Sequence, residues 1–329
     1  LVILALPVAV RIARGPDFGF TVHQLEVVRV RPGGPGDAAG IAPGDLVLGV
    51  GERAVTTMHE YYAAVAGDGN LEPLTVSLDR DGRQATVVVN PTRPERADMI
   101  RQYTLWVTGL AFLAIGWWVF WQRGDPVARN FFALCFIFAF FLVDVPDRPD
   151  VTYMHVKDLV RLLMQDLLPA YFLRFLLQFP TPDHRNPRAS SPTVQRLLLV
   201  PGWLLFAGTA GLELFHPDPR STGLLPILAS ATLVYALGYF LAGLVVFARR
   251  ALRRDRPIRR TKMRVVLTGL VCGIVPFLAT TAMGNYLPAS VAGPWQTMAL
   301  SLVLLPVSFS LAIMRYGALD AAFVVRVGL

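Results

Sequence analysis

Cysteine is scarce in this sequence, with two residues in a chain of 329. Cys135 and Cys272 both lie inside apolar runs, so the sequence contains no disulfide framework and no cysteine/histidine spacing typical of a metal site. We interpret both as small buried hydrophobic residues. No cofactor motif is found either, so we predict a chain without cofactor or metal.

Charged residues are also few. They make up 16% of the sequence against 54% hydrophobic residues, and the mean hydropathy is +0.48. Soluble domains rarely show this balance, whereas membrane proteins with several spans normally do. The net charge of +8 does not indicate a nucleic-acid partner, because the basic residues lie in loops beside apolar runs and not on an aromatic-interleaved surface. The expected partner is the lipid bilayer.

The first segment, residues 1–13, is apolar but shorter than the roughly 20 residues that a membrane-crossing helix needs. Two interpretations stay open: the end of a truncated signal anchor, or the core of a cleaved signal peptide. Both place the residues that follow outside the cytoplasm.

Residues 15–93 have the composition of a small soluble domain with strands, turns and one helix. Asp81-Gly82 between two strand-like runs is a strong hairpin signal. The pattern predicts a β-rich domain with strand-like stretches at 22–31, 46–50, 74–80 and 84–90 and a helix at 58–66.

Residues 102–315 contain recurring apolar runs, which predict an all-α bundle of about seven membrane-spanning helices. The fold class is therefore mixed: a small β-rich domain followed by a polytopic helical bundle. The second run is the shortest and the least secure as a span. The predicted spans are 103–121, 130–145, 156–179, 197–215, 224–248, 265–283 and 295–314.

The loops between these runs differ in basic residues, and this bias fixes the expected orientation. One set of alternate loops holds 16 Lys and Arg residues, nine of them between Arg249 and Arg264, and the other set holds 3. Short loops rich in Lys and Arg stay on the cytoplasmic side. We therefore expect a cytoplasmic C-terminus and an extracytoplasmic domain at residues 15–93.

The segment from Gly36 to Asp45, GDAAGIAPGD, is followed by the strand-like LVLGV. Gly40 and Gly44 suit turns with positive φ, and Asp45 suits a turn cap before a buried strand. This spacing resembles the core signature of PDZ domains. The resemblance implies a PDZ fold outside the cytoplasm.

Upstream, Asp17-Phe18-Gly19-Phe20 resembles the PDZ loop that binds a peptide carboxylate, with Arg14 near the basic position that often precedes it. In that family a peptide or protein C-terminus binds the loop amides and adds as a strand between the next β-strand and the helix. The alternative is a buried strand start in a domain that has lost peptide binding. The peptide-binding residues that the resemblance implies are Phe18, Gly19, Phe20, Thr21, Val22, His59 and Tyr62.

Three segments of the apolar region resemble the multi-span sensor region of bacterial histidine kinases, which is related to sensor regions preceding sporulation-type serine phosphatases. They are Phe179–Pro182, Arg259–Arg264 and Leu305–Leu329. The resemblance implies an exit segment at 316–329 that leads to a cytoplasmic output domain beyond this chain, homodimerisation, and location in the bacterial inner membrane. An ordinary membrane anchor at this end is the alternative.

The predicted span at 156–179 carries charged residues that membrane helices normally avoid. Asp158 and Arg161 are spaced to pair, and Asp166 lies deeper. Pairing between helices and a ligand or proton site are both open interpretations.

Catalysis is not predicted for these residues. His59-Glu-Tyr-Tyr62 lacks the second histidine of a zinc-protease HExxH motif. We therefore expect a sensor input module that relays peptide binding to a kinase or phosphatase. A membrane scaffold that localises partners through the PDZ domain is the alternative.

Overall fold

The computed structural model describes residues 15–66, 71–143, 148–179, 191–215, 224–252, 264–276 and 297–314. The chain divides into two compact units. The first contains the described residues up to Tyr103 together with residues 148–158. The second contains Thr104–Val143 and the described residues from Leu159 onward.

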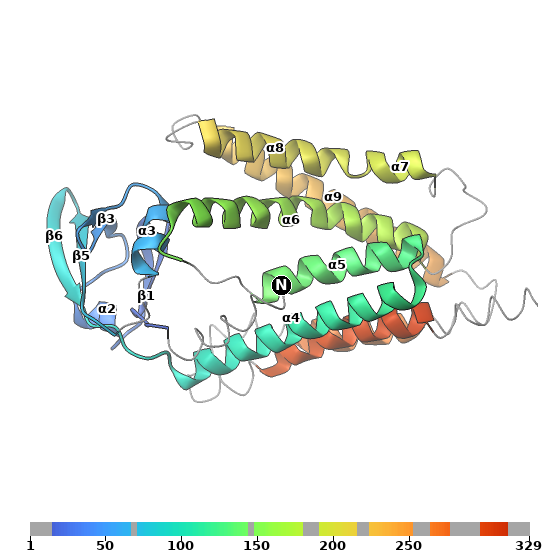
Figure 1. The fold of residues 1–329 in the computed structure, drawn as a ribbon, viewed down its shortest axis with the longest axis horizontal. Helices are drawn as coiled ribbons and strands as arrows, with labels where there is room; N and C mark the ends of the chain where they lie inside the picture. Colours follow the sequence, from blue (N-terminus) through green and yellow to red (C-terminus); the bar gives the residue numbers. More distant parts are fainter. Residues whose placement is uncertain are drawn as a thin grey trace, which may run out of the picture. The chain divides into compact units, whose positions relative to one another are not determined.

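The first unit is built on a six-stranded sheet in the order β1-β2-β3-β5-β6, with β4 paired to β3 (Figure 1). All the described pairings are antiparallel. The strands are β1 (Phe20–His23), β2 (Glu26–Val30), β3 (Leu46–Val50), β4 (Arg53–Ala54), β5 (Leu74–Arg80) and β6 (Arg83–Val89).

The hairpin predicted at Asp81-Gly82 is confirmed. Both residues have positive φ, 53° and 79°, and they join β5 to β6. Reading residues 22–31 as one strand-like stretch was wrong, because Gln24 and Leu25 also have positive φ, 54° and 67°, and reverse the chain between β1 and β2. This turn lacks the glycine or asparagine that normally marks such a conformation in a sequence.

Two helices accompany the sheet, α2 (Pro35–Ala38) and α3 (Met58–Val65). Helix α3 begins with a capping box: the Thr57 side chain accepts a hydrogen bond from the Glu60 amide, and the Glu60 carboxylate accepts one from the Thr57 amide. Apolar residues from the strands and α3 form the core; the best buried are Val27, Val47, Val76, Leu78 and Val89.

The C-terminal part of the chain is mostly helical (Figure 1). Its elements are α4 (Arg96–Arg123), α5 (Pro126–Val143), α6 (Val151–Gln178), α7 (Pro192–Leu197), α8 (Val200–Phe215), α9 (Leu224–Leu252), the apolar helix Arg264–Pro276, and the stretch Met298–Met314, which begins within the 3₁₀ turn η1 (Thr297–Val303).

Three of these helices, Asp98–Arg123, Pro126–Val143 and Leu224–Arg250, are long and apolar enough to cross a membrane. The mixed fold class and the membrane character of the chain are therefore confirmed at this level. The complete set of seven spans stays a prediction, since α6 carries several charges and parts of the last two runs lie outside the described residues.

Aromatic rings dominate the core of the second unit. Phe175 packs against Phe131, Phe179 and Phe309 with ring centroids 5.7, 5.4 and 5.1 Å apart. Cys135 is buried in this core as predicted. Cys272 was wrongly expected to be buried: it is exposed in the structure.

Candidate peptide-binding site

The open edge of strand β1, next to helix α3, is the candidate peptide-binding site. Among the described strands β1 pairs with β2 alone, so its other edge has no strand partner. The Leu25 amide, in the turn after β1, donates to the sulfur of Met58 at 3.2 Å and ties β1 to the first residue of α3. An extended peptide can add to such an edge through main-chain hydrogen bonds.

The loop before β1 needs its glycine. Gly19 has φ +70°, and a Cβ there would lie 2.7 Å from the Cδ of Pro35, at the start of α2. The Gly19 carbonyl also accepts a hydrogen bond from the Arg31 amide at 2.8 Å. The loop is therefore held tightly against α2 and the end of β2.

The predicted site residues of β1 and its loop differ in what they offer a ligand. Phe18 and Phe20 are half-buried and pack edge to face, with ring centroids 6.4 Å apart. Thr21 is exposed. Val22 is buried in the core, so it presents only its backbone. The alternation follows from the opposite directions of successive side chains in a strand.

The predicted residues of α3 lie near its start and its middle. Tyr62 is partly exposed and packs against the ring of Tyr61 at 5.5 Å. Nε2 of His59 lies 2.9 Å from Oδ2 of Asp158, although not in the direction of a regular hydrogen bond. The His59 ring also stacks on His155, with centroids 3.8 Å apart.

His155 and Asp158 belong to the first turns of α6, within the first unit. The sequence allowed Asp158 to pair with Arg161; among the described residues its close side-chain contact is instead with His59. The contact joins residues about a hundred positions apart, which no local pattern reveals.

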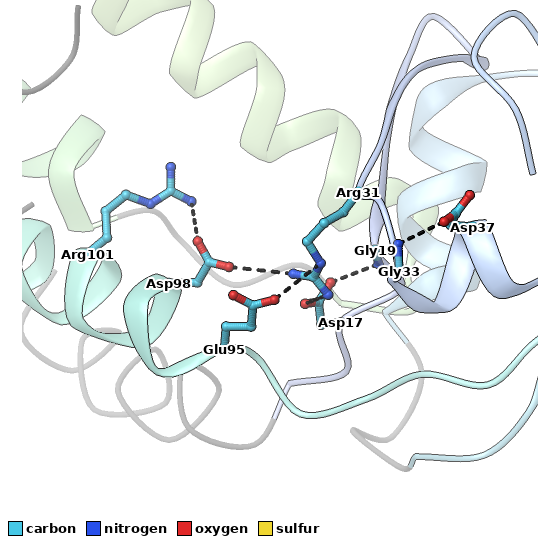
Figure 2. A network of polar contacts seen from close by, with 8 residues as sticks. All are labelled: Asp17, Gly19, Arg31, Gly33, Asp37, Glu95, Asp98 and Arg101. Carbon is cyan, nitrogen blue, oxygen red and sulfur yellow. Dashed lines mark hydrogen bonds and ion pairs between the residues drawn. The ribbon is translucent and has the colours of Figure 1, made fainter. Parts of the chain in front are cut away.

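A network of ion pairs centred on Arg31 lies beside the loop at Asp17–Phe20 (Figure 2). Oδ1 of Asp17 accepts a hydrogen bond from the Gly19 amide at 2.8 Å, and Oδ2 lies 2.7 Å from Nη2 of Arg31. Glu95 and Asp98 lie 3.5 and 3.8 Å from the same guanidinium. Partial burial opposes the charge, but the bond to Asp17 and the three carboxylates raise the pKa of Arg31.

A second ion pair supports the sheet behind the PDZ-like turn. Asp45 is buried and accepts from the Ala42 amide at 2.8 Å, so its predicted role as a turn cap is confirmed. Both its oxygens bind Arg80, each at 2.6 Å. The hydrogen bond from Arg80 lowers the pKa of Asp45 below its usual range.

The structure places the predicted residues on one loop, one strand and one helix, and their role in binding stays a prediction. Most of the charged contacts around them were not predicted. Arg31 and Arg80 were not named, and the contact of Asp158 with His59 was not predicted, because each of these contacts joins separate elements of the fold. Arg14, named as the basic residue before the loop, lies outside the described residues. In the part of the chain that the structure describes, no cluster of three His, Cys, Asp or Glu residues is arranged for a metal ion.

Comparison with known proteins addresses the same region. Residues 26–76 match the family model of the PDZ domain. No curated protein matches the chain. The matched segment runs from β2 into β5 and includes the turn at Gly40 and Gly44 and helix α3. Residues 26–76 thus form a PDZ domain.

Proposed function

We propose that this chain is the membrane input module of a bacterial signal-transduction protein. Its PDZ domain lies outside the cytoplasm and binds a peptide or protein segment, and the helical region relays this binding to a cytoplasmic kinase or phosphatase. The observation that carries the proposal is the edge of β1 beside α3, which has no partner among the described strands. It belongs to a unit that matches the PDZ domain and is followed by helices long and apolar enough to cross a membrane.

The relay is supported by the contact of α3 with α6. Helix α6 is continuous from Val151 to Gln178, and its first turns hold the partners of His59. A ligand lying along α3 would therefore act at one end of a continuous helix whose later residues belong to the second unit. A ligand can shift α6 from one conformation to another only if it binds one of them more tightly than the other.

Peptide binding is tested on the whole chain in detergent or nanodiscs with a synthetic peptide library. We expect saturable binding to the unchanged chain and its loss in Gly19→Val, because a side chain there meets Pro35. Gly33→Val is the matched control, since Gly33 has nearly the same φ, +71°, but open space around it. Equal loss in both variants, or no loss in either, contradicts a site at this loop.

The relay is tested by hydrogen exchange of α6 with and without a bound peptide. We expect ligand to change the exchange of residues 151–178, and we expect Asp158→Asn, which alters the partner of His59, to bind peptide without that change. Val156→Ala, at an exposed position of the same helix turn, is the control. Binding that leaves α6 unchanged in the native chain removes the relay and favours the scaffold.

Sidedness is tested by reporters. A reporter inserted at Gly82 and one fused after Leu329 are expected on opposite sides of the membrane. Both on the same side would contradict the proposal.

A further inference from the structure

We infer that the groove of this PDZ domain takes an internal, extended peptide segment and discriminates against a free C-terminal carboxylate. The inference deepens the proposed function and rests on its peptide-binding step. It comes from one juxtaposition: the carboxylate of Asp17 occupies the Gly19 amide, the central one of the loop amides that a ligand carboxylate would use, and further acids lie beside it.

The occupied amide is that of Gly19. A backbone N–H makes one strong hydrogen bond, and this one goes to Oδ1 of Asp17 at 2.8 Å. Gly19 is also the central residue of the loop that the family resemblance assigns to carboxylate binding. A ligand carboxylate would have to displace an acceptor of the same chemical type that is already attached to the chain.

Asp17 is held from both sides. Its backbone makes two hydrogen bonds with Thr92, Asp17 N to Thr92 O at 2.8 Å and Thr92 N to Asp17 O at 3.0 Å. Its second carboxylate oxygen pairs with Arg31. Displacing the side chain therefore breaks a charged hydrogen bond and an ion pair together.

The surrounding charge also disfavours an anion (Figure 2). Arg31 pairs with Asp17 of the loop, and the carboxylates of Glu95 and Asp98 lie near the same guanidinium. Arg101 offsets part of the excess by pairing with Asp98 at 3.6 Å. Within this network three carboxylates therefore face two guanidinium groups, and like charges at such distances repel.

The edge of β1 needs no terminal carboxylate from its ligand. Strand addition uses main-chain groups of the ligand, which an internal segment supplies as well as a terminus does. Thr21 in this strand is exposed. The remaining recognition therefore favours an extended segment that continues past the loop.

The test uses the whole chain in nanodiscs and two synthetic peptide libraries of identical sequences, one with a free C-terminal carboxylate and one with a C-terminal amide. We expect amidated peptides to bind as tightly as their acids or more tightly. In Asp17→Asn, whose amide oxygen can keep the bond to Gly19, the acids should gain affinity by about tenfold relative to the amides.

Two further variants separate charge from loop structure. Glu95→Gln removes an acid that does not bond the loop backbone, and it should shift the acid-to-amide ratio in the same direction by a smaller factor. Asp37→Asn is the matched control: Asp37 accepts from the Gly33 amide at 2.8 Å, as Asp17 does from Gly19, but takes no part in the Arg31 network. It should leave the ratio unchanged.

The outcomes distinguish failure of the internal-ligand inference from failure of the proposed peptide binding. Tighter binding of free acids by the native chain overturns the internal-ligand inference while the proposed peptide binding stands. Absence of saturable binding by both libraries overturns peptide binding itself, and the inference with it. A shift in Asp37→Asn equal to that in Asp17→Asn also overturns the inference, because the effect would not come from the network.

Discussion

The two units of this protein satisfy their buried charges in different ways. In the PDZ unit, buried Asp45 binds the side chain of Arg80 on another strand. In the helical unit, buried Arg250 donates to main-chain carbonyls at the end of α6, those of Leu176, Leu177 and Phe179. Helix ends carry carbonyls without intrahelical partners, so a basic side chain there needs no acid.

The comparison predicts which substitutions should destabilise each unit. The side-chain pair in the sheet can be broken from either partner and responds to pH, because one member is a carboxylate. The helix-end contact has one removable partner, and its loss leaves several backbone groups unsatisfied at once. The first two predictions below test this difference, and the other two test packing and capping within each unit.

The largest effect is expected from Arg250→Leu. Removing the guanidinium leaves the last carbonyls of α6 without donors in a buried place, at a cost of about 3 kcal/mol in the free energy of unfolding. Unfolding in mixed detergent micelles measures it. Arg249→Leu is the control, since Arg249 is exposed. Equal effects of both changes would show that Arg250 is not the stabilising contact.

Asp45→Asn should cost about 2 kcal/mol in the PDZ unit, because a buried ion pair becomes a weaker polar contact. Hydrogen exchange of β3 and β5 reports it. The lowered pKa of Asp45 means that its contribution is fully present above the unfolded pKa of about 3.9 and is lost as pH falls through the lower folded value. Native protein should therefore lose protection on acidification, and Asp45→Asn should lose less.

Close packing gives a second comparison inside the helical unit. A Cβ at Gly202 would lie 2.5 Å from the main-chain oxygen of Asp166, whereas one at Gly211 in the same helix meets nothing within 4 Å. Gly202→Ala should therefore destabilise the unit by about 1–2 kcal/mol, and Gly211→Ala should be neutral or slightly stabilising. Thermal unfolding in detergent compares them. Similar midpoints would contradict tight contact of α6 and α8.

The smallest effect is expected at the cap of α3. Thr57→Ala removes the acceptor for the Glu60 amide at the helix start and should cost about 1 kcal/mol. Thr56→Ala removes only an exposed hydroxyl bond to Glu60 and should cost less. Hydrogen exchange of residues 58–65 separates the two. Greater exchange in Thr56→Ala would show that the capping box does not hold this helix.

Much of the fold was readable from local patterns. The Asp81-Gly82 hairpin, helix α3 and the turn glycines Gly40 and Gly44 were predicted because each depends on the conformational preference of a few adjacent residues. The turn at Gln24 and Leu25 was missed, because neither residue prefers positive φ and packing in the core imposes it.

The candidate site was likewise only partly predictable from the sequence. The loop containing Gly19 and the helix residues His59 and Tyr62 were named from a motif. The contacts that decide how the loop and helix act were not, since Asp17 with Arg31 and His59 with Asp158 form only when separate elements meet. No spacing rule connects residues that the fold alone brings together.

By itself, the sequence determined that the chain combines a small PDZ domain with apolar helices, because turn preference, strand alternation and hydropathy act over short stretches of chain. Only the tertiary structure decided that the Gly19 amide is already bonded to Asp17, that α3 contacts the start of α6, and that Arg250 meets the end of α6. The physical reason is distance: hydrogen bonds and ion pairs depend on separations of about 3 Å in space, which sequence separation does not encode.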